Sequence, residues 1–239
     1  MRLRAVVAIG IGLVLGTGLL GGSAAEGQSM QPPVRASVSG PPQVVTVRAS
    51  SSRSTHAVLE VWSRQPRGGY RRVAGPWQAR VGYSGVGRPH EGSGRTPAGV
   101  WPLGPGFGVD TRNPGTTLRW FTVDSRDAWG SDVRSPGTYN RHVRCRPGRC
   151  PFRESHAERL IRYPRAYRYA MFIGYNAPPH VVVGAGSAFF LHVGTGGPTA
   201  GCVSLSASRV VWLLRHLRPG AVISIGASTR AYTAITSVR

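Results

Sequence analysis

The chain has 239 residues, which suits one large β-rich domain or two small ones and is ample for a hydrophobic core. Its 30 basic residues are all arginines, and with only 9 acids they give a formal net charge of +21. This charge attracts polyanions in general. The arginines are scattered through the chain without a recognition helix, which argues against a nucleic-acid partner. A GC-rich genome would also favour arginine over lysine.

The first 25 residues have the features of a secretory signal peptide. Arg2 and Arg4 precede an apolar run over residues 5–20, and small residues follow at Ser23-Ala24-Ala25. We expect this signal to engage the membrane only for export, so that the protein is secreted or held in the cell envelope. The alternative is an uncleaved signal that tethers the domain to the outer face of the plasma membrane.

Residues 26–54 are rich in proline, serine, glycine and valine without an amphipathic period, which predicts a linker before a domain over residues 55–239. Short strands are predicted from there on. They are expected at residues 56–63, at two positions within 69–85 broken at Gly75-Pro76, and at 99–108, 117–125, 168–175, 187–193 and 221–226.

Two segments have the composition of short helices. Residues 154–162 form the first, and residues 209–217 form the second, with Ser206 or Ser208 as its N-cap. Many short strands with Gly and Pro turns and only two short helices predict a mainly β fold, either a β-sandwich or a barrel.

Three cysteines in an exported chain leave one unpaired after any disulfide forms. Cys145 and Cys150 flank a Pro-Gly turn in the sequence CRPGRC, and an oxidising compartment favours a disulfide between them. The alternative is a metal site in which His142 and His156 join the two cysteines, but its spacing is loose compared with zinc-finger patterns. We therefore expect no metal, and Cys202 is the unpaired thiol.

Cys202 follows a strand-borne histidine, His192, by ten positions, with a glycine-rich loop between them. A cysteine is a useful nucleophile only as thiolate, which a nearby imidazole favours. Gly201 has no side chain, so the amides of Gly201 and Cys202 can approach a tetrahedral oxyanion. The alternative is that Cys202 is a small buried hydrophobe and His192 a satisfied polar strand end.

The sequence LHVG…PTAGCVSL resembles the signature of the L,D-transpeptidase catalytic domain, and residues 92–104, GSGRTPAGVWPLG, are similar to the Thr-Pro-x-Gly turn and strand of that family. The resemblance implies an L,D-transpeptidase-like β-sandwich or barrel that needs no cofactor and acts on peptidoglycan stem peptides. Cys202 would attack an L-to-D peptide bond, with His192 as base and then acid. Gly201 and Cys202 would supply the oxyanion hole, and a backbone carbonyl would orient the imidazole.

Three departures from the family pattern indicate a divergent, short-loop branch. These are the ten-position gap, Val193 after the histidine, and Ser204 in place of Arg or Asn. Candidate residues of the substrate cleft are Tyr175, Asn176, Thr199 and Ser204, although Tyr175-Asn176 at a strand end also suits a turn. A long polar segment at residues 124–153 is a candidate lid.

Two other functions remain open from the sequence. With water as acceptor, the same pair of residues would give an L,D-carboxypeptidase or endopeptidase. Alternatively, the chain is a non-catalytic, arginine-rich domain that binds the anionic polymers of the cell envelope.

Overall fold

The structure, a computed structural model, describes residues 40–67 and 69–228 of the chain. The predicted signal peptide lies outside the described residues, as does the first part of the predicted linker, residues 26–39. Within the described ranges, no helix has the length and apolar character that a membrane crossing requires.

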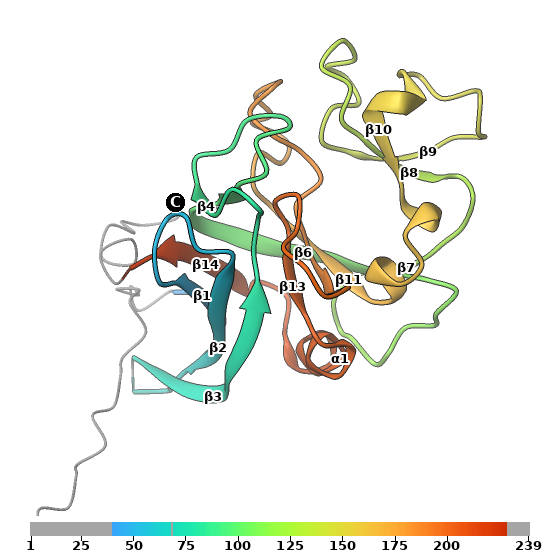
Figure 1. The fold of residues 1–239 in the computed structure, drawn as a ribbon. Helices are drawn as coiled ribbons and strands as arrows, with labels where there is room; N and C mark the ends of the chain where they lie inside the picture. Colours follow the sequence, from blue (N-terminus) through green and yellow to red (C-terminus); the bar gives the residue numbers. More distant parts are fainter. Residues whose placement is uncertain (1–39, 68, 229–239) are drawn as a thin grey trace, which may run out of the picture. The chain divides into compact units, whose positions relative to one another are not determined.

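Nine strands form the main sheet. In chain order they are β1 (Gln43–Ala49), β2 (His56–Arg64), β3 (Tyr70–Arg80), β6 (Gly99–Val109), β7 (Trp120–Val123), β11 (Ala170–Ile173), β12 (Phe190–Val193), β13 (Val203–Leu205) and β14 (Val222–Ala227). Their spatial order is β11-β12-β13-β3-β2-β1-β14-β6-β7, and a further pairing of β11 with β6 closes all of them except β7 into a barrel (Figure 1). The prediction of a mainly β fold is confirmed, in its barrel form.

The strand β1 corrects the predicted linker at residues 26–54. It pairs in parallel with β14 and antiparallel with β2, so it is an internal strand of the barrel. Its valines Val44, Val45 and Val47 are fully buried, as β-branched side chains in a two-sided strand often are. The folded domain therefore begins before Thr55.

The strand β3 corrects the predicted break at Gly75-Pro76, because it runs through both residues. The pairing between β2 and β3 shifts register between Leu59 and Val61, which is the pattern of a β-bulge. Gly75 has φ of +91°, and a Cβ there would lie 2.6 Å from the carbonyl oxygen of Leu59. The Gly-Pro pair thus bends one strand instead of ending it.

The second predicted helix is present as α1 (Ala207–His216). Ser206 is its N-cap residue, although its side chain makes no capping hydrogen bond. The apolar face buries Val210, Leu213 and Leu214 in the main core, which also contains Leu191 of β12 and Val203 of β13. The helix therefore supports the strand that carries His192 and the strand that directly follows Cys202.

The first predicted helix, residues 154–162, is wrong. The segment is a strand, β10 (Ala157–Arg159), between two 3-10 turns at Glu154–His156 and Leu160–Arg162. It pairs with β8 (Asp127–Gly130), which also pairs with β9 (His142–Arg144). Helical propensity in this segment is overridden by pairing with a strand that is distant in sequence.

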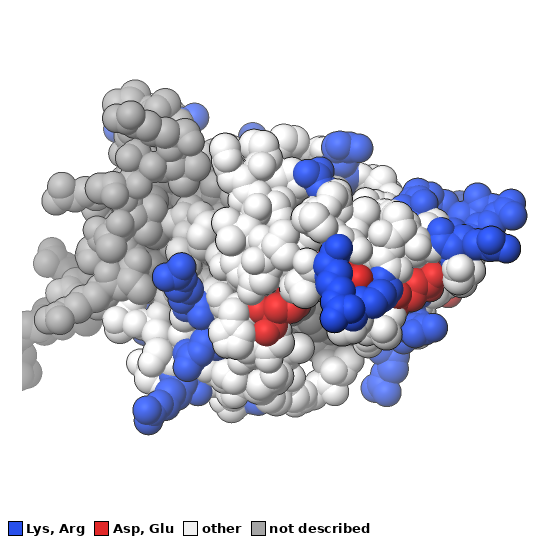
Figure 2. All heavy atoms as spheres, turned by 90° about the horizontal axis from the view of Figure 1, so that it is seen from above, with Lys and Arg blue, Asp and Glu red and all other residues white. Residues whose placement is uncertain are grey.

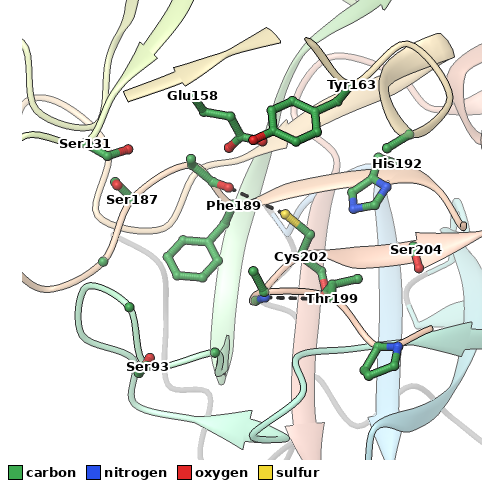
Figure 3. Close-up of a pocket in the computed structure, with 18 of the residues that line it drawn as sticks. Ser93, Ser131, Glu158, Tyr163, Ser187, Phe189, His192, Thr199, Cys202 and Ser204 are labelled. Carbon is green, nitrogen blue, oxygen red and sulfur yellow. Dashed lines mark hydrogen bonds between the residues drawn. The ribbon is translucent and has the colours of Figure 1, made fainter. Parts of the chain in front are cut away.

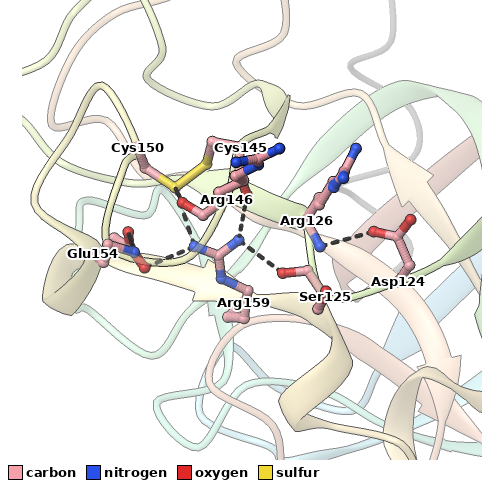
Figure 4. The surroundings of a disulfide bond; sticks show 9 residues. Asp124, Ser125, Arg126, Cys145, Arg146, Cys150, Glu154 and Arg159 are labelled. Atoms are coloured by element: carbon pink, nitrogen blue, oxygen red, sulfur yellow. Dashed lines mark hydrogen bonds and ion pairs between the residues drawn. A yellow bond between two sulfur atoms is a disulfide. The ribbon is translucent and has the colours of Figure 1, made fainter.

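Arg159, at the end of β10, is buried and bonds to hydrogen-bond acceptors from three separate parts of the chain (Figure 4). Its guanidinium donates to the carbonyl oxygens of Ser125 at 3.1 Å and Cys145 at 3.2 Å, and to the carboxylate of Glu154 at 2.7 Å. These charge-assisted bonds stabilise the three-stranded sheet beside the barrel. We call residues 124–169, which contain this sheet, the cap segment.

The disulfide between Cys145 and Cys150 is present, with 5.1 Å between the Cα atoms. Arg159 donates to Cys150 Sγ at 3.1 Å (Figure 4). Among the described residues no group of three or more His, Cys, Asp or Glu side chains could hold a metal ion. His142 instead bonds to the buried carboxylate of Asp127 at 2.8 Å.

Replacing both Cys145 and Cys150 by serine is expected to lower the free energy of unfolding by about 2 kcal/mol, since the disulfide closes a short loop. Urea denaturation in the absence of reductant measures the change. A mild reductant should lower the wild-type midpoint similarly and leave the double variant unchanged. An unaltered midpoint in the double variant would contradict a stabilising role for this disulfide.

The cap segment packs against the barrel through an aromatic cluster. Trp129, Leu160 and Tyr167 of the cap segment share a buried cluster with Phe190 of β12 and with Cys202. The rings of Tyr167 and Phe190 meet edge to face with 5.4 Å between centroids. This contact holds the cap segment beside the candidate nucleophile.

Candidate active site

The chain brings His192 and Cys202 into one pocket by pairing two short strands. β12 and β13 are parallel neighbours in which His192 pairs with Ser204, and Cys202 directly precedes β13. Both side chains are nearly buried, with 8% of each residue exposed, and both line a pocket of about 320 Å³ (Figure 3). The structure therefore brings the histidine and the cysteine named from the sequence to the lining of one pocket.

The loop between the two strands, residues 194–202, is fixed at Thr199. The Thr199 amide donates to the carbonyl of Val81 at 3.0 Å, and its carbonyl accepts from the amide of Tyr83 at 2.8 Å. Parallel neighbours usually need a crossover of a dozen or more residues. Here a loop of nine residues connects the two strands. The strands are short, and the residues that follow β3, Val81 and Tyr83, hydrogen-bond to the loop at Thr199.

Two threonine hydroxyls hold the carbonyl of Cys202. Thr199 Oγ1 donates to it at 2.6 Å and accepts from the amide of Gly201 at 3.1 Å. Thr96 Oγ1 donates to the same carbonyl at 3.3 Å and accepts from the amide of Gly82 at 2.8 Å. The Thr-Pro-x-Gly segment and the Thr-Ala-Gly-Cys segment, far apart in sequence, therefore meet at the backbone of Cys202. The Gly201 amide of the predicted oxyanion hole is already bonded within the loop.

Gly201 has a backbone conformation that a side chain would not tolerate. Its φ is +143°, and a Cβ would lie 2.7 Å from Cε1 of Phe189 and 3.1 Å from the carbonyl oxygen of Arg95. Left-handed backbone of this kind strongly favours glycine. The residue before Cys202 is therefore fixed by local geometry.

Changing Gly201 to alanine is expected to lower the free energy of unfolding by about 3 kcal/mol, because backbone strain and a steric clash act together. Gly197 in the same loop is the matched control, since a Cβ there meets nothing within 4 Å. Chemical denaturation of the two alanine variants measures the difference. Equal free energies of unfolding in the two variants would contradict this prediction, because they would show that Phe189 and the loop move to accommodate the new Cβ without loss of stability.

The sulfur of Cys202 lies among backbone groups. It accepts a hydrogen bond from the amide of Phe190 at 3.3 Å and donates to the carbonyl of Ala188 at 3.5 Å. Burial raises the pKa of the thiol well above its ordinary value, the nearby carboxylate of Glu158 raises this pKa further, and the Phe190 amide lowers it. In the structure Cys202 is therefore a neutral thiol at neutral pH.

The imidazole of His192 is fixed by the backbone. Nδ1 bonds to the carbonyl oxygen of Val193 at 2.8 Å, so Nδ1 carries the proton and Nε2 is the basic nitrogen. Burial lowers the pKa of His192 below its ordinary value, and the bond to Val193 partly offsets this. The edge-to-face ring of Tyr167, 5.6 Å away, packs against the imidazole. His192 is thus neutral at pH 7 and able to accept a proton.

The described structure has no hydrogen bond between Cys202 Sγ and His192. Figure 3 shows the imidazole on β12 and the sulfur on the residue just before β13, with the sulfur directed toward the backbone at residues 188–190. Catalytic hydrogen bonds are often long before substrate binds. A rotation of the Cys202 side chain toward the imidazole is the change that proton transfer requires.

Of the four candidate cleft residues, two line this pocket. Thr199 and Ser204 are among its lining residues, and Ser204 lies beside His192 as its pairing partner. Tyr175 and Asn176 are not among the residues that line it.

Tyr175 and Asn176 hold the loop that follows β11. The Tyr175 hydroxyl donates to the carbonyl of Ala185 at 2.9 Å, and the Asn176 side chain both accepts from the amide of Val182 at 2.7 Å and donates to its carbonyl at 2.9 Å. Asn176 also has φ of +50°, which asparagine tolerates better than most residues. The turn interpretation of these two residues is therefore the correct one.

The candidate lid at residues 124–153 contributes only one lining residue, Ser131. Its Asn140 is buried, accepts from the indole of Trp129 at 2.9 Å, and donates to the carbonyl oxygens of Tyr175 at 3.0 Å and Asn176 at 2.7 Å. These bonds attach the segment to the barrel.

Sequence reasoning missed two acidic residues of the pocket, Glu91 and Glu158. The hydroxyl of Tyr167 donates to Glu158 Oε1, and burial raises the pKa of Glu158 to about 7, although the bond from Tyr167 lowers it. A helix at residues 154–162 would have given no reason to place Glu158 near Cys202. No local pattern in the sequence marks either glutamate.

Comparison of the sequence with protein-family models finds no match, and comparison with curated proteins finds no relative either. The chemistry of the pocket therefore has to be read from its own residues.

Proposed function

We propose that the protein is a secreted cysteine L,D-transpeptidase that acts on peptidoglycan stem peptides through an acyl-enzyme at Cys202. One observation carries the proposal: a buried thiol and a backbone-oriented, neutral imidazole share a pocket at the ends of two paired strands. The resemblance of residues 191–205 to the family signature supplies the substrate class. The fold supports it as well, because rigid strands hold both groups.

The proposed reaction moves one proton twice. His192 Nε2 takes the thiol proton as Cys202 Sγ attacks the carbonyl carbon of an L-to-D peptide bond. The tetrahedral intermediate then expels the amine of the D-residue, which receives this proton from His192, and the acyl group stays on sulfur as a thioester. An amine of a second stem peptide, or water, then attacks the thioester and regenerates the thiol.

Developing negative charge on the carbonyl oxygen needs hydrogen-bond donors. The proposed donors are the amides of Gly201 and Cys202, of which the Gly201 amide must exchange its bond to Thr199 for one to the oxyanion. Such a donor typically lowers the barrier by about 3 kcal/mol. The neutral resting thiol fits this scheme, because the base is needed only when substrate has entered.

The proposal is tested by acylation of Cys202. Intact-mass spectrometry after incubation with a carbapenem is expected to show one adduct, which peptide mapping assigns to Cys202. The disulfide of Cys145 and Cys150 should stay unlabelled, and His192→Ala should slow the labelling strongly. A Cys202 that stays inert under native conditions would favour the non-catalytic domain that binds anionic wall polymers.

Muropeptides as substrates separate the two acceptors. Mass spectrometry of the incubated mixture is expected to show crosslinked dimers, which only transfer to an amine produces. Trimmed stems without dimers would instead identify an L,D-carboxypeptidase or endopeptidase.

A further inference from the structure

Most acids of this arginine-rich chain are paired with a cation. Among the eight acidic residues in the described part of the chain, Glu60, Asp124, Asp127, Asp132 and Glu154 form ion pairs. The described residues contain no ion pair for the other three, Glu91, Asp110 and Glu158. With 30 arginines in the sequence, an acid without a cation is the exception.

Two of these three acids, Glu91 and Glu158, line the pocket of Cys202. No arginine is among the described residues that line it. Figure 2 shows the contrast with the surface, where arginine side chains spread over the visible face and acidic ones are few. A cleft lined by one sign of charge concentrates ligands of the opposite sign.

Neutral hydroxyls orient the two carboxylates without neutralising them. Glu91 Oε2 accepts from Ser187 Oγ at 3.0 Å and from the hydroxyl of Tyr139, and Glu158 Oε1 accepts from the hydroxyl of Tyr167. Both glutamates are half-buried. A partly buried carboxylate without a cation is costly, so a cationic ligand group would relieve the cost at both positions.

A separate observation points to a ligand in the same pocket. Ser204 is only 2% exposed and lines the pocket, yet its hydroxyl has no hydrogen-bond partner among the described residues. His192 Nε2, on the paired strand, is likewise without a partner in the described structure. Neither Ser204 Oγ nor His192 Nε2 is among the fully buried side-chain atoms that lack a partner, so both atoms are open to the pocket and can bond to a polar ligand.

We propose that the pocket recognises a primary ammonium group of its ligand through Glu158 and Glu91. Glu158 lies on the cap segment, and Glu91 lies in the loop before β5 (Thr96–Pro97), so two separate elements each bring a carboxylate to the pocket lining. The identity of the ligand as a stem peptide with a free side-chain amine rests on the proposed function. The preference for a cation does not.

Thiol reagents of opposite charge test the preference directly at Cys202. Its thiolate attacks the reagent's sulfenyl sulfur, forms a mixed disulfide and releases methanesulfinate, so no further oxidant is needed. We compare aminoethyl methanethiosulfonate, which is cationic, with sulfonatoethyl methanethiosulfonate, which is anionic, at pH 8 and relative to a free thiol. The cationic reagent is expected to react about 10-fold faster, as one nearby charge can achieve.

The ratio of the cationic to the anionic reaction rate, measured in variants, identifies the residues that favour the cation. Glu158→Gln is expected to lower the ratio of cationic to anionic rate about 10-fold, and Glu91→Gln should lower it in the same direction. Asp110→Asn is the matched control, because Asp110 is exposed, unpaired among the described residues and outside the pocket lining. The ratio cancels any change in thiol pKa, since both reagents need the same thiolate.

Faster reaction with the anionic reagent, which the net charge of +21 alone would favour, overturns the inference even without any variant. So does an equal fall of the ratio in Asp110→Asn and Glu158→Gln. Calorimetry with Cys202→Ala then compares a stem peptide whose side-chain amine is free or acetylated, and tighter binding of the free amine is expected. Reagent selectivity without any peptide binding would uphold the cation preference and count against the proposed substrate.

Discussion

Changing Cys202 to alanine is expected to lower turnover of stem-peptide substrates on the order of 10⁴-fold or more, since no other group of the pocket can form the acyl intermediate. Ser204 is the pairing partner of His192 and lines the same pocket, but in the described structure no base is bonded to its hydroxyl. Muropeptide turnover followed by mass spectrometry measures the loss. Turnover within tenfold of the wild type would remove Cys202 from the mechanism.

The alanine variant should keep its fold, which makes the loss interpretable. Cys202 is a small member of the cluster around Phe190 and Tyr167, and the threonine bonds go to its backbone carbonyl, which the alanine variant keeps. Cys202→Ser is the second control, because it keeps the shape of the side chain while its hydroxyl is a far weaker nucleophile. The free energy of unfolding of both variants is expected to lie within about 1 kcal/mol of the wild-type value.

Changing His192 to glutamine is expected to lower kcat/KM by about 10²- to 10⁴-fold, the usual contribution of a general base. Glutamine can still donate to the Val193 carbonyl, but it cannot accept the thiol proton. The wild-type kcat/KM should fall as the pH drops through a midpoint below 6.5, because burial lowers the pKa of His192 and protonation removes the base. The raised pKa of Cys202 keeps the thiol neutral up to alkaline pH, so thiolate formation adds no rise near neutrality.

The pH profile of the variants assigns that midpoint. The low-pH fall should be missing from the residual rate of His192→Gln. Glu158 ionises near pH 7 and could add a second step, so Glu158→Gln is the control that leaves the His192 midpoint alone. If kcat/KM still falls at low pH in His192→Gln but no longer does so in Glu158→Gln, the titrating group is the carboxylate of Glu158 and not His192.

Local sequence patterns predicted most strands of the main sheet and the second helix. The elements that depend on pairing between distant segments could not be predicted in this way. The apolar patterns of HAVLEVWS and AVISIG marked β2 and β14, whereas β1 was assigned to a linker because prolines and serines surround its short apolar run. The strand at residues 157–159 exists only because β8 is beside it. Closure of the barrel by β11 and β6 leaves no local trace, since the two strands are distant in sequence.

The candidate site divides in the same way. His192, Gly201 and Cys202 lie within one short segment, so their chemistry could be predicted from the sequence. The contact of Thr96 with the Cys202 carbonyl and the placement of Glu158 depend on the tertiary fold. Tyr175 and Asn176 were misplaced in the cleft because their side chains bond within their own loop.

The fixed point at Thr199 also divides the loop between β12 and β13 into two parts with different tolerance to change. Thr199, Gly201 and Cys202 are hydrogen-bonded to the barrel or to one another, so a deletion between Thr199 and Cys202 would move the sulfur. At Gly196 and Gly197 the backbone is exposed, and a Cβ meets nothing within 4 Å. Inserted residues at that tip are expected to change the rim of the pocket without moving Cys202, so the tip should tolerate changes of loop length or an attached reporter group.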